Sequence, residues 1–318
     1  MKRFFLRVKK ELFLIRRLLH EGYGPKFWWP YAKNRFFGIY LFKRLPRYEY
    51  VADPDFELHT ICCRQDLWML AWMLRSFFEM SKLRPAIVIH EDGTMDPATA
   101  ELIKSKFANV TIIFRKEAIK QISDMPGIPD IIKKAKAEGH FFMDKLIDIH
   151  IFSKAKKVLA TDTDILYYKT PTEIIDFVEG RSDRDALVQH QGKDEQIFKI
   201  MADDFYSTKY QLVEKKIAMM NGGYILINKD AFNLDRLAEC LTHVERPFND
   251  YFSEMGAWAC LLAQVNFGFL PPERYAIKGR LNDQMVLKHY TSPRRYEMFA
   301  YGIDESRKAV DREEKKIG

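Results

Sequence analysis

The chain has 318 residues, which is enough for one large α/β domain with additional segments or for two modest domains. Apolar residues make up 47% of it, so a substantial core can form and global disorder is not expected. The formal net charge of +7 is concentrated at the N-terminus instead of following a basic stripe, and no nucleic-acid-binding motif is present. We therefore expect no nucleic-acid partner.

The cysteines and the apolar runs bear on the compartment. The four cysteines lack the spacing of a metal site and stand in apolar contexts, which favours buried, reduced thiols and a cytoplasmic protein. The longest uninterrupted apolar run near the N-terminus, residues 12–15, is too short for a signal peptide or a membrane span.

Residues 1–50 are expected to form an extension. Apolar residues repeat at helical spacing from Phe5 to Leu19 with basic residues among them, and two aromatic-rich stretches follow before residue 45. Basic helices with aromatic flanks suit an anionic membrane surface, so residues 1–45 are a candidate peripheral contact with the inner face of the membrane. Packing of these helices on their own domain, with the cations in solvent, explains the pattern equally well.

A folded domain is expected over residues 51–302. Apolar runs and turn residues predict its first elements: strands at 56–62, 86–90 and 110–114, and helices at 66–80 and 97–107, each helix preceded or opened by an aspartate. Alternation of strands and helices implies a parallel, doubly wound sheet with helices on both faces. The chain has no Gly-x-Gly-x-x-Gly motif and no P-loop, which disfavours nicotinamide-dependent and P-loop enzymes.

The second half of the domain is predicted in the same way. The expected elements are helices from 131, at 142–153, from 171, at 230–243 and at 251–264, and strands from 157, at 186–188, 224–227, 267–272 and 285–290. The charged segment 303–318 is expected to be a solvated helix or disordered.

The most informative stretch is 157–168. Its apolar run from Val158 to Ala160 is typical of a strand buried on both faces. Asp162 and Asp164 follow, and they point the same way if the extended geometry continues. Carboxylates at the carboxyl end of such a strand lie where open α/β sheets bind ligands, and they are costly unless a cation such as Mn²⁺ or Mg²⁺ neutralises them. A bare Asp-x-Asp is more often a turn or a helix cap, but the apolar flanks favour a metal site here.

Two later patterns carry polar groups next to apolar strands. Asn221, Gly222 and Gly223 precede an apolar run, and glycine lets the backbone approach a ligand closely. Taken alone, Asn-Gly-Gly is more often a turn. His289 stands near the end of the last predicted strand, where a histidine is ordinarily a satisfied core or surface residue.

In this order, the motifs resemble those of the GT-A glycosyltransferases, especially the glycogenin-like enzymes and the bacterial lipopolysaccharide sugar transferases. The resemblance covers roughly residues 55–295 and is carried by four motifs: Asp144-Lys145 before the strand, Asp162-Thr163-Asp164, Asn221-Gly222-Gly223 and His289-Tyr290. It implies a Rossmann-like, mostly parallel twisted sheet flanked by helices. It also implies transfer of a sugar from a nucleotide sugar, with UDP as the expected nucleotide, to a saccharide or glycolipid acceptor, in surface polysaccharide or glycolipid synthesis.

The resemblance also implies roles for single residues. Asp164 would be the main ligand of Mn²⁺ or Mg²⁺, Asp162 would bind metal, ribose or both, and His289 would be a third ligand. Cys62, Cys63 and Arg64 are expected to lie near the nucleotide, and Arg294, Arg295 or Lys288 near the phosphates. Lys145 would contact either the donor sugar or Asp162. Asn221 and Gly222 would line the donor or acceptor sugar.

The acceptor's proton needs a base if the reaction inverts configuration. Glu254 is the candidate, although a carboxylate favoured by the helix dipole is the more frequent explanation of such a residue. The family's Gly and Lys after the late histidine and its Asp-Gln block have no clear counterparts, which leaves stereochemistry open. Two alternatives remain: a sugar nucleotidyltransferase, disfavoured because residues 62–67 contain no glycine, and a non-catalytic binding module.

Overall fold

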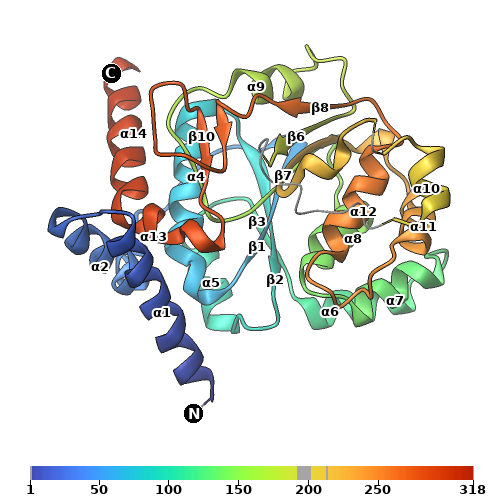
Figure 1. Cartoon of the computed structure of the whole chain (residues 1–318), viewed down its shortest axis with the longest axis horizontal. Coiled ribbons are helices and arrows are strands. Elements are labelled where there is room, and N and C mark those ends of the chain that lie inside the picture. Colours follow the sequence, from blue (N-terminus) through green and yellow to red (C-terminus); the bar gives the residue numbers. More distant parts are fainter. Residues whose placement is uncertain (1, 192–201, 213, 318) are drawn as a thin grey trace.

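The centre of the molecule is a seven-stranded sheet with the order β3-β2-β1-β4-β7-β6-β8 (Figure 1). The computed structural model describes residues 2–191, 202–212 and 214–317. The strands of this sheet are β1 (Asp53–Cys62), β2 (Pro85–Glu91), β3 (Val110–Ile113), β4 (Lys157–Thr161), β6 (Ala186–His190), β7 (Met220–Asn228) and β8 (Phe267–Leu270). Strand β7 is antiparallel to both of its neighbours, and every other pair in the sheet is parallel. The predicted α/β class with a mostly parallel sheet is confirmed.

Helices cover both faces of the sheet, as Figure 1 shows. One face is covered by α4 (Leu67–Ser81) and α5 (Pro97–Lys104), and α14 (Ile303–Ile317) and α9 (Thr172–Val178) pack against α4. The other face is covered by α6 (Arg115–Asp124), α7 (Asp130–Glu138), α8 (Phe142–Phe152), α10 (Asp204–Lys209), α11 (Leu234–His243) and α12 (Ser253–Leu262).

The central strands are apolar throughout because they are buried on both sides. In β4, Val158 and Ala160 belong to the cluster under α8 and α12, whereas Leu159 belongs to the cluster under α4. In β7, Ile225 and Leu226 divide between the two clusters in the same way. Side chains of a strand alternate between the two faces, so such a run must be hydrophobic at every position.

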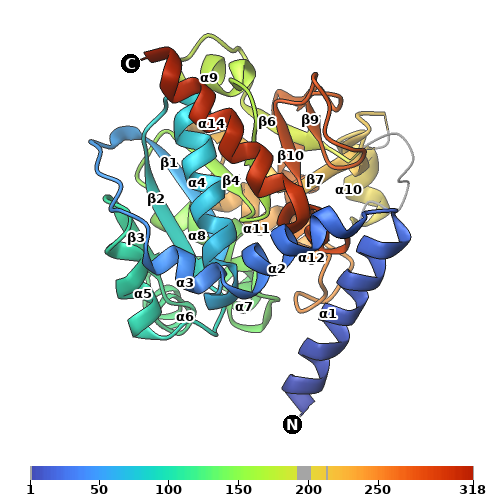
Figure 2. The same cartoon turned by 90° about the vertical axis from the view of Figure 1, so that its left-hand side faces the viewer.

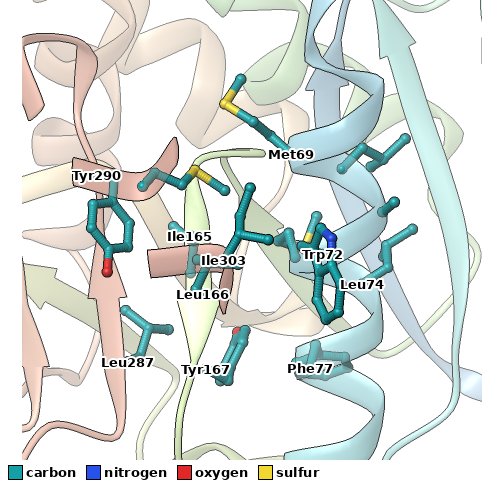
Figure 3. Close-up of a cluster of buried hydrophobic side chains, with 14 of the residues drawn as sticks. Met69, Trp72, Leu74, Phe77, Ile165, Leu166, Tyr167, Leu287, Tyr290 and Ile303 are labelled. Atoms are coloured by element: carbon teal, nitrogen blue, oxygen red, sulfur yellow. The ribbon is translucent and has the colours of Figure 1, made fainter. Parts of the chain in front are cut away.

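A small second sheet joins two segments that are far apart in sequence. It has the order β5-β10-β9, with β5 (Ile165–Tyr167), β9 (Tyr275–Ala276) and β10 (Leu287–His289). Figure 3 shows Tyr167 beside Phe77 of α4, with Ile303 of α14 in the same cluster. Antiparallel pairing sets His289 opposite Ile165, so the histidine arrives next to the residue that follows Asp164.

The N-terminal segment consists of helices α1 (Lys2–His20), α2 (Trp28–Phe36) and α3 (Gly38–Lys43), with a 3₁₀ turn at Pro25–Phe27. Helix α2 packs against the π-helical turn η6 (Met298–Gly302), α3 packs against α4, and α1 packs against α13 (Arg295–Glu297). Figure 2 shows α1 projecting from the body of the molecule. The predicted boundary near residue 50 stays a prediction.

None of the helices within the described residues is both long and apolar enough to cross a bilayer.

Several predicted elements differ in detail. Helix α6 was not predicted, since only Ala118 and Ile122 are buried on it and its apolar pattern is weak. Asp66 ends a 3₁₀ turn, Arg64–Asp66, and its side chain makes no capping hydrogen bond to α4. Asp96, in contrast, accepts a hydrogen bond from the backbone N of Thr99 and caps α5.

The last two differences lie in the C-terminal half. Helix α11 begins at Leu234, four residues later than predicted, because Lys229–Ala231 forms a 3₁₀ turn and Asn233 caps the helix. The segment from residue 303 is helical. One side of this helix is not solvated, because its own residues Ala309 and Val310 are buried against the rest of the protein.

A buried ionic network ties α8 to its neighbours. Lys136 of α7 donates to Asp148 at 2.7 Å and to Asp144 at 3.0 Å, both on α8. His90 of β2 contacts Asp148 at 3.1 Å, and Arg115 of α6 donates to Asp144 at 2.9 Å. Because buried charges need such partners, this network holds α8 in one position relative to α7 and β2.

Candidate active site

A cleft of about 310 Å³ opens at the carboxyl ends of β1, β2 and β4. Open α/β sheets bind ligands at this edge. The cleft is lined by residues that follow these strands, by β7, by the first residues of α8 and α12, and by the segment after β10. The sequence motifs around residues 162, 222, 254 and 289 all reach it.

Asp162, Asp164 and His289 converge in this cleft. Their ligand atoms all lie within 4.8 Å of one another. Nε2 of His289 is 3.2 Å from Oδ1 of Asp164 and 3.6 Å from Oδ2 of Asp162. Ligand atoms about 2.1 Å from one ion, in an octahedral shell, lie about 3 Å apart, so the spacing fits a small divalent cation. Carboxylate oxygens with one imidazole nitrogen suit the expected Mn²⁺ or Mg²⁺.

The two aspartates meet for a reason other than the one that strand alternation predicts. The chain leaves β4 after Thr161 and turns before β5, so the extended geometry does not continue through the motif. The backbone is held on both sides of this turn instead. Asp162 N donates to Gly223 O at 2.9 Å, and Tyr290 N donates to Asp164 O at 2.7 Å.

The orientation of His289 is fixed by Gln189 of β6. The side-chain amide of Gln189 donates from Nε2 to the carbonyl of Tyr275, so its Oε1 faces Nδ1 of His289 at 2.9 Å. Nδ1 must therefore carry the proton, which leaves the lone pair of Nε2 directed at the two aspartates. This is the tautomer that a metal ligand needs. Oδ1 of Asp164 is buried and has no hydrogen-bond partner among the described residues, which also suits this oxygen to bind a cation.

Two cationic side chains bind the other carboxylate oxygens of Asp162 and Asp164. Lys145 is buried and donates to Oδ1 of Asp162 at 2.9 Å and to the carbonyl of Gly222 at 3.0 Å. Arg295 donates from Nε to Oδ2 of Asp164 at 2.7 Å. Burial opposes ionisation of Asp164, but the guanidinium group of Arg295 outweighs it and holds the pKa of this carboxyl group below its usual value. The remaining oxygens are the ones that face His289.

Asn221, Gly222 and Gly223 form the part of the cleft wall that lies beside Asp162. A Cβ on Gly223 would lie 2.3 Å from Cε1 of His289, and one on Gly222 would lie 3.0 Å from Oε2 of Glu254. Only glycine lets β7 pass this close to the triad. Asn221 accepts from Gly223 N and donates to Gln191, so it shapes the strand end as much as it lines the cleft.

Glu254 stands at the start of α12 and is 5% exposed. Burial raises the pKa of its carboxyl group to about 7, Lys145 lowers it in part, and Asp162 raises it further. Its Oε1 has no hydrogen-bond partner in the part of the chain that the structure describes. A carboxyl group with a pKa near neutrality is suited to accepting a proton from a substrate.

Four of the residues expected near the donor lie elsewhere. Cys62 is buried and directed at the carbonyl of Cys63, and Arg64 extends to the exposed Asp96, whereas Cys63 and Asp66 line the cleft. Arg294 pairs with Glu297, and it is Arg295, the next residue, that reaches the cleft. Lys288 points away from His289, because neighbours on a strand alternate, and donates to Glu297, Tyr301 and Gly279.

No sequence pattern pointed to Gln189, Asp92, Phe141 or Phe142 as residues of the site. Gln189 could have been noticed only as a polar residue that continues a buried strand after Val188. Asp92 follows β2 at the same sheet edge as Asp162 follows β4, and that position is a usable signal.

Acidic side chains outnumber cationic ones in the lining. The carboxylates are Asp66, Asp92, Asp162, Asp164 and Glu254, and the permanently cationic groups are Lys145 and Arg295. A diphosphate would meet net repulsion here without an additional cation. The charge balance of the cleft therefore favours a divalent ion together with an anionic ligand.

Several solved structures with a similar chain path are glycosyltransferases. Mouse xyloside xylosyltransferase 1, in its apo form, is 10% identical with a TM-score of 0.45, over 74% of this chain and 98% of that chain. The bifunctional glycosyltransferase WbbM is 12% identical with a TM-score of 0.49, over 84% of this chain and 53% of that chain. The galactosyltransferase LgtC, in complex with donor and acceptor sugar analogues, is 12% identical with a TM-score of 0.48, over 80% of this chain and 95% of that chain.

In architecture, the chain resembles glycosyltransferases. This is the class that the sequence motifs resemble. A scan against models of protein families found no match, and neither did a comparison with curated proteins. The likeness is one of chain path alone.

Proposed function

We propose that the protein is a metal-dependent glycosyltransferase that moves a sugar from a nucleotide sugar, with UDP as the expected nucleotide, to an acceptor hydroxyl. The observation that carries the proposal is the convergence of Asp162, Asp164 and His289, with a fixed histidine tautomer, in an acidic cleft. Such a cleft needs a cation to hold a diphosphate. The expected acceptor is a saccharide or glycolipid, in surface polysaccharide or glycolipid synthesis.

The side chains divide the work of the reaction. Mn²⁺ or Mg²⁺ held by Asp162, Asp164 and His289 would supply a Lewis acid to the leaving diphosphate. Arg295 adds a fixed positive charge on the same wall, where negative charge develops as the glycosidic bond breaks. Lys145 holds Asp162 in position and keeps its own proton, because Asp162 and Glu254 raise its pKa against the effect of burial.

Glu254 is our candidate base for an inverting transfer. It lines the cleft, its carboxyl group has a raised pKa, and one of its oxygens has no partner among the described residues. In its ionised form it can take the proton of the acceptor hydroxyl as that oxygen attacks the sugar. The proton then resides on the carboxyl group, and the diphosphate leaves with the bonding electron pair.

A donor screen tests the proposal directly. The full chain is incubated with Mn²⁺ and a set of UDP, GDP and CMP sugars, and free nucleotide is measured. Release of nucleoside diphosphate that depends on metal supports a transferase. Exchange of labelled pyrophosphate into a sugar nucleotide would point to the alternative nucleotidyltransferase, and binding of donor without turnover would point to a non-catalytic module.

We propose in addition that the N-terminal helices contact an anionic membrane surface. Residues 1–50 hold 13 Lys and Arg against 3 Glu, a formal charge of +10, whereas the rest of the chain, with 38 basic and 41 acidic residues, carries −3. The helices also present large apolar side chains to solvent, among them Leu12, Trp28, Trp29 and Phe36. Exposed aromatic residues together with basic ones suit the interface of an anionic bilayer.

Each N-terminal helix packs against the domain with one side and exposes apolar side chains on another. Leu14 and Leu18 of α1 and Tyr31 of α2 are buried, while Phe13 and Trp29 are not. Helix α1 packs against α13, whose first residue, Arg295, lines the cleft. A membrane-borne acceptor is therefore compatible with the place of the cleft.

A further inference from the structure

A group of aromatic side chains forms one wall of the cleft, and no step proposed above uses it. Phe141 and Phe142 lie at the start of α8, and Tyr251 lies two residues before α12. All three line the cleft, and we call them the aromatic shelf. The ring centroids of Phe141 and Phe142 are 4.6 Å apart, and those of Phe142 and Tyr251 are 5.1 Å apart.

The shelf is supported from behind. The ring of His140 lies 4.2 Å from that of Phe141 and 5.7 Å from that of Tyr251, and His140 N donates to the carbonyl of Phe248. The ring of Phe252 packs edge-on against Tyr251 at 4.9 Å. Tyr251 is nevertheless 51% exposed. A supported ring that stays half exposed in the wall of a cleft is not explained by core packing, and it is available to a ligand.

We propose that the aromatic shelf is the acceptor subsite and that it stacks against the C–H face of a pyranose ring. The proposal names the acceptor class of the function proposed above and rests on that function. The face of an aromatic ring carries partial negative charge, and the axial C–H groups of a pyranose carry partial positive charge. Stacking also removes apolar surface from water while the hydroxyl groups stay at the rim.

Tyr251, the exposed ring of the shelf, lies on the side of the cleft that the nucleotide does not need. In the sheet, β1 and β2 lie on one side of β4, and β7 lies on the other. Cys63 and Asp92 follow β1 and β2 and line the first side, where the nucleotide is expected. Tyr251 stands beside α12, which packs against β7. Asp162, after β4, lies between the two sides, so a sugar on the shelf faces the metal ligands from the acceptor side.

The polar neighbours of the shelf favour a sugar over a purely apolar ligand. Glu254 follows Tyr251 by three residues and lines the same cleft, as do Lys145 and Asn221. These groups offer a carboxylate, an ammonium and an amide to hydroxyl groups at the rim of a stacked ring. A lipid chain would offer no hydrogen bond to Oε1 of Glu254, which has no partner among the described residues, and would leave it unsatisfied at a cost.

Saturation-transfer NMR on the full chain tests the shelf without knowledge of the natural acceptor. The probe is methyl β-D-galactopyranoside, and mannitol serves as an acyclic control without a rigid C–H face. The variants are Tyr251→Ala and Phe142→Ala, with Tyr40→Ala as the matched control, since Tyr40 is 50% exposed and lies outside the cleft. We expect ring-proton signals that fall about fivefold in each shelf variant, the contribution of one ring contact, and persist in the control.

A titration with UDP and Mn²⁺ on the same proteins separates this inference from the proposed function. If wild type binds UDP with Mn²⁺ but gives no galactoside signal, or a signal that mannitol equals, the shelf is not a pyranose subsite. A galactoside signal unchanged in both shelf variants has the same meaning. Absence of UDP binding in wild type contradicts the proposed function instead, whatever the sugar signal shows.

Discussion

Single residues determine whether the cleft can hold a metal ion. The three candidate ligand side chains come from two segments more than 120 positions apart, and one atom of each lies near the same point. Lys145 and Arg295 occupy the other carboxylate oxygens. Removal of a ligand should therefore affect metal binding far more than stability.

Asp164→Ala is expected to abolish metal-dependent donor turnover, with a loss of about 100-fold or more, because it removes a ligand and leaves Arg295 free to repel the cation. Mn²⁺ calorimetry and nucleotide release measure the two effects. Asp183→Ala is the control, since the Asp183 side chain is 89% exposed. Turnover like that of wild type in Asp164→Ala would contradict the assignment.

Gln189→Met is expected to weaken Mn²⁺ binding about 10-fold or more, because the shape of the side chain is kept while the acceptor that fixes the His289 proton is lost. Calorimetry gives the affinity, and the nitrogen shifts of His289 report its tautomer. Gln264→Met applies the same change at a site remote from the cleft. Equal affinities in the two variants would remove Gln189 from the site.

The raised pKa of Glu254 predicts a pH dependence. Its carboxyl group is protonated below about 7 and ionised above, so the rate of an inverting transfer should rise as pH increases through that value. Glu254→Gln should remove this rise and lower the rate about 100-fold or more. A pH–rate profile under saturating Mn²⁺ measures both, and a rise that survives in Glu254→Gln means that another group is the base.

The sequence predicts which residues converge in the cleft where those residues belong to a motif. It does not do so where the direction of a side chain depends on its exact position in a short turn or strand. Asp162, Asp164 and His289 meet as the motif order implies. Arg295 and Arg294 are neighbours in a short turn, and nothing in the composition of that turn tells which of them faces the cleft. Gln189 was not found because its function depends on its contact with a histidine 100 positions away.

At the scale of the element, strands were easier to predict than short amphipathic helices. Buried strands such as β4 and β7 are apolar throughout, which makes them visible in a sequence. Helix α6 has only two buried residues, and α11 begins after a 3₁₀ turn that propensities do not reveal. The pairing of β5 with β10 has no local signature, since it joins positions about 120 residues apart.

Helix α8, which carries Lys145, should depend on the ionic network behind it. Lys136→Met would leave Asp148 and Asp144 without their buried cation and should lower the free energy of unfolding by about 3–5 kcal/mol. Lys104→Met, at an exposed position, is the control. Urea denaturation measures both proteins, and equal stabilities would mean that water or Arg115 compensates for the lost charge.

At the scale of the whole molecule, positive charge and exposed aromatic side chains are concentrated in the N-terminal helices. The N-terminal helices carry the entire net positive charge of the chain. Replacing both Trp28 and Trp29 by serine should reduce binding to phosphatidylglycerol-containing vesicles about tenfold or more, because each indole adds apolar contact. Phe205→Ser, an exposed aromatic on α10, is the control.

Vesicle sedimentation of the full chain, at low and high salt, measures this effect. Binding should also fall with salt and be weak on pure phosphatidylcholine. Binding of the tryptophan double variant equal to that of wild type would contradict the membrane contact. Deletion of the N-terminal helices is a poorer test, because Tyr31 and Phe42 are buried against the domain.

Helix α14 limits how far recombinant forms of this protein can be truncated at the C-terminus. Its Ser306 donates to the carbonyl of Tyr167 in β5, and Ile303 fills the cluster behind the small sheet that delivers both Asp164 and His289. The charged tail looks dispensable in the sequence, yet a version that ends before residue 303 would lose the packing behind the strands that position Asp164 and His289. A crystallographer shortening the chain should spare this end, and an affinity tag placed there needs a spacer.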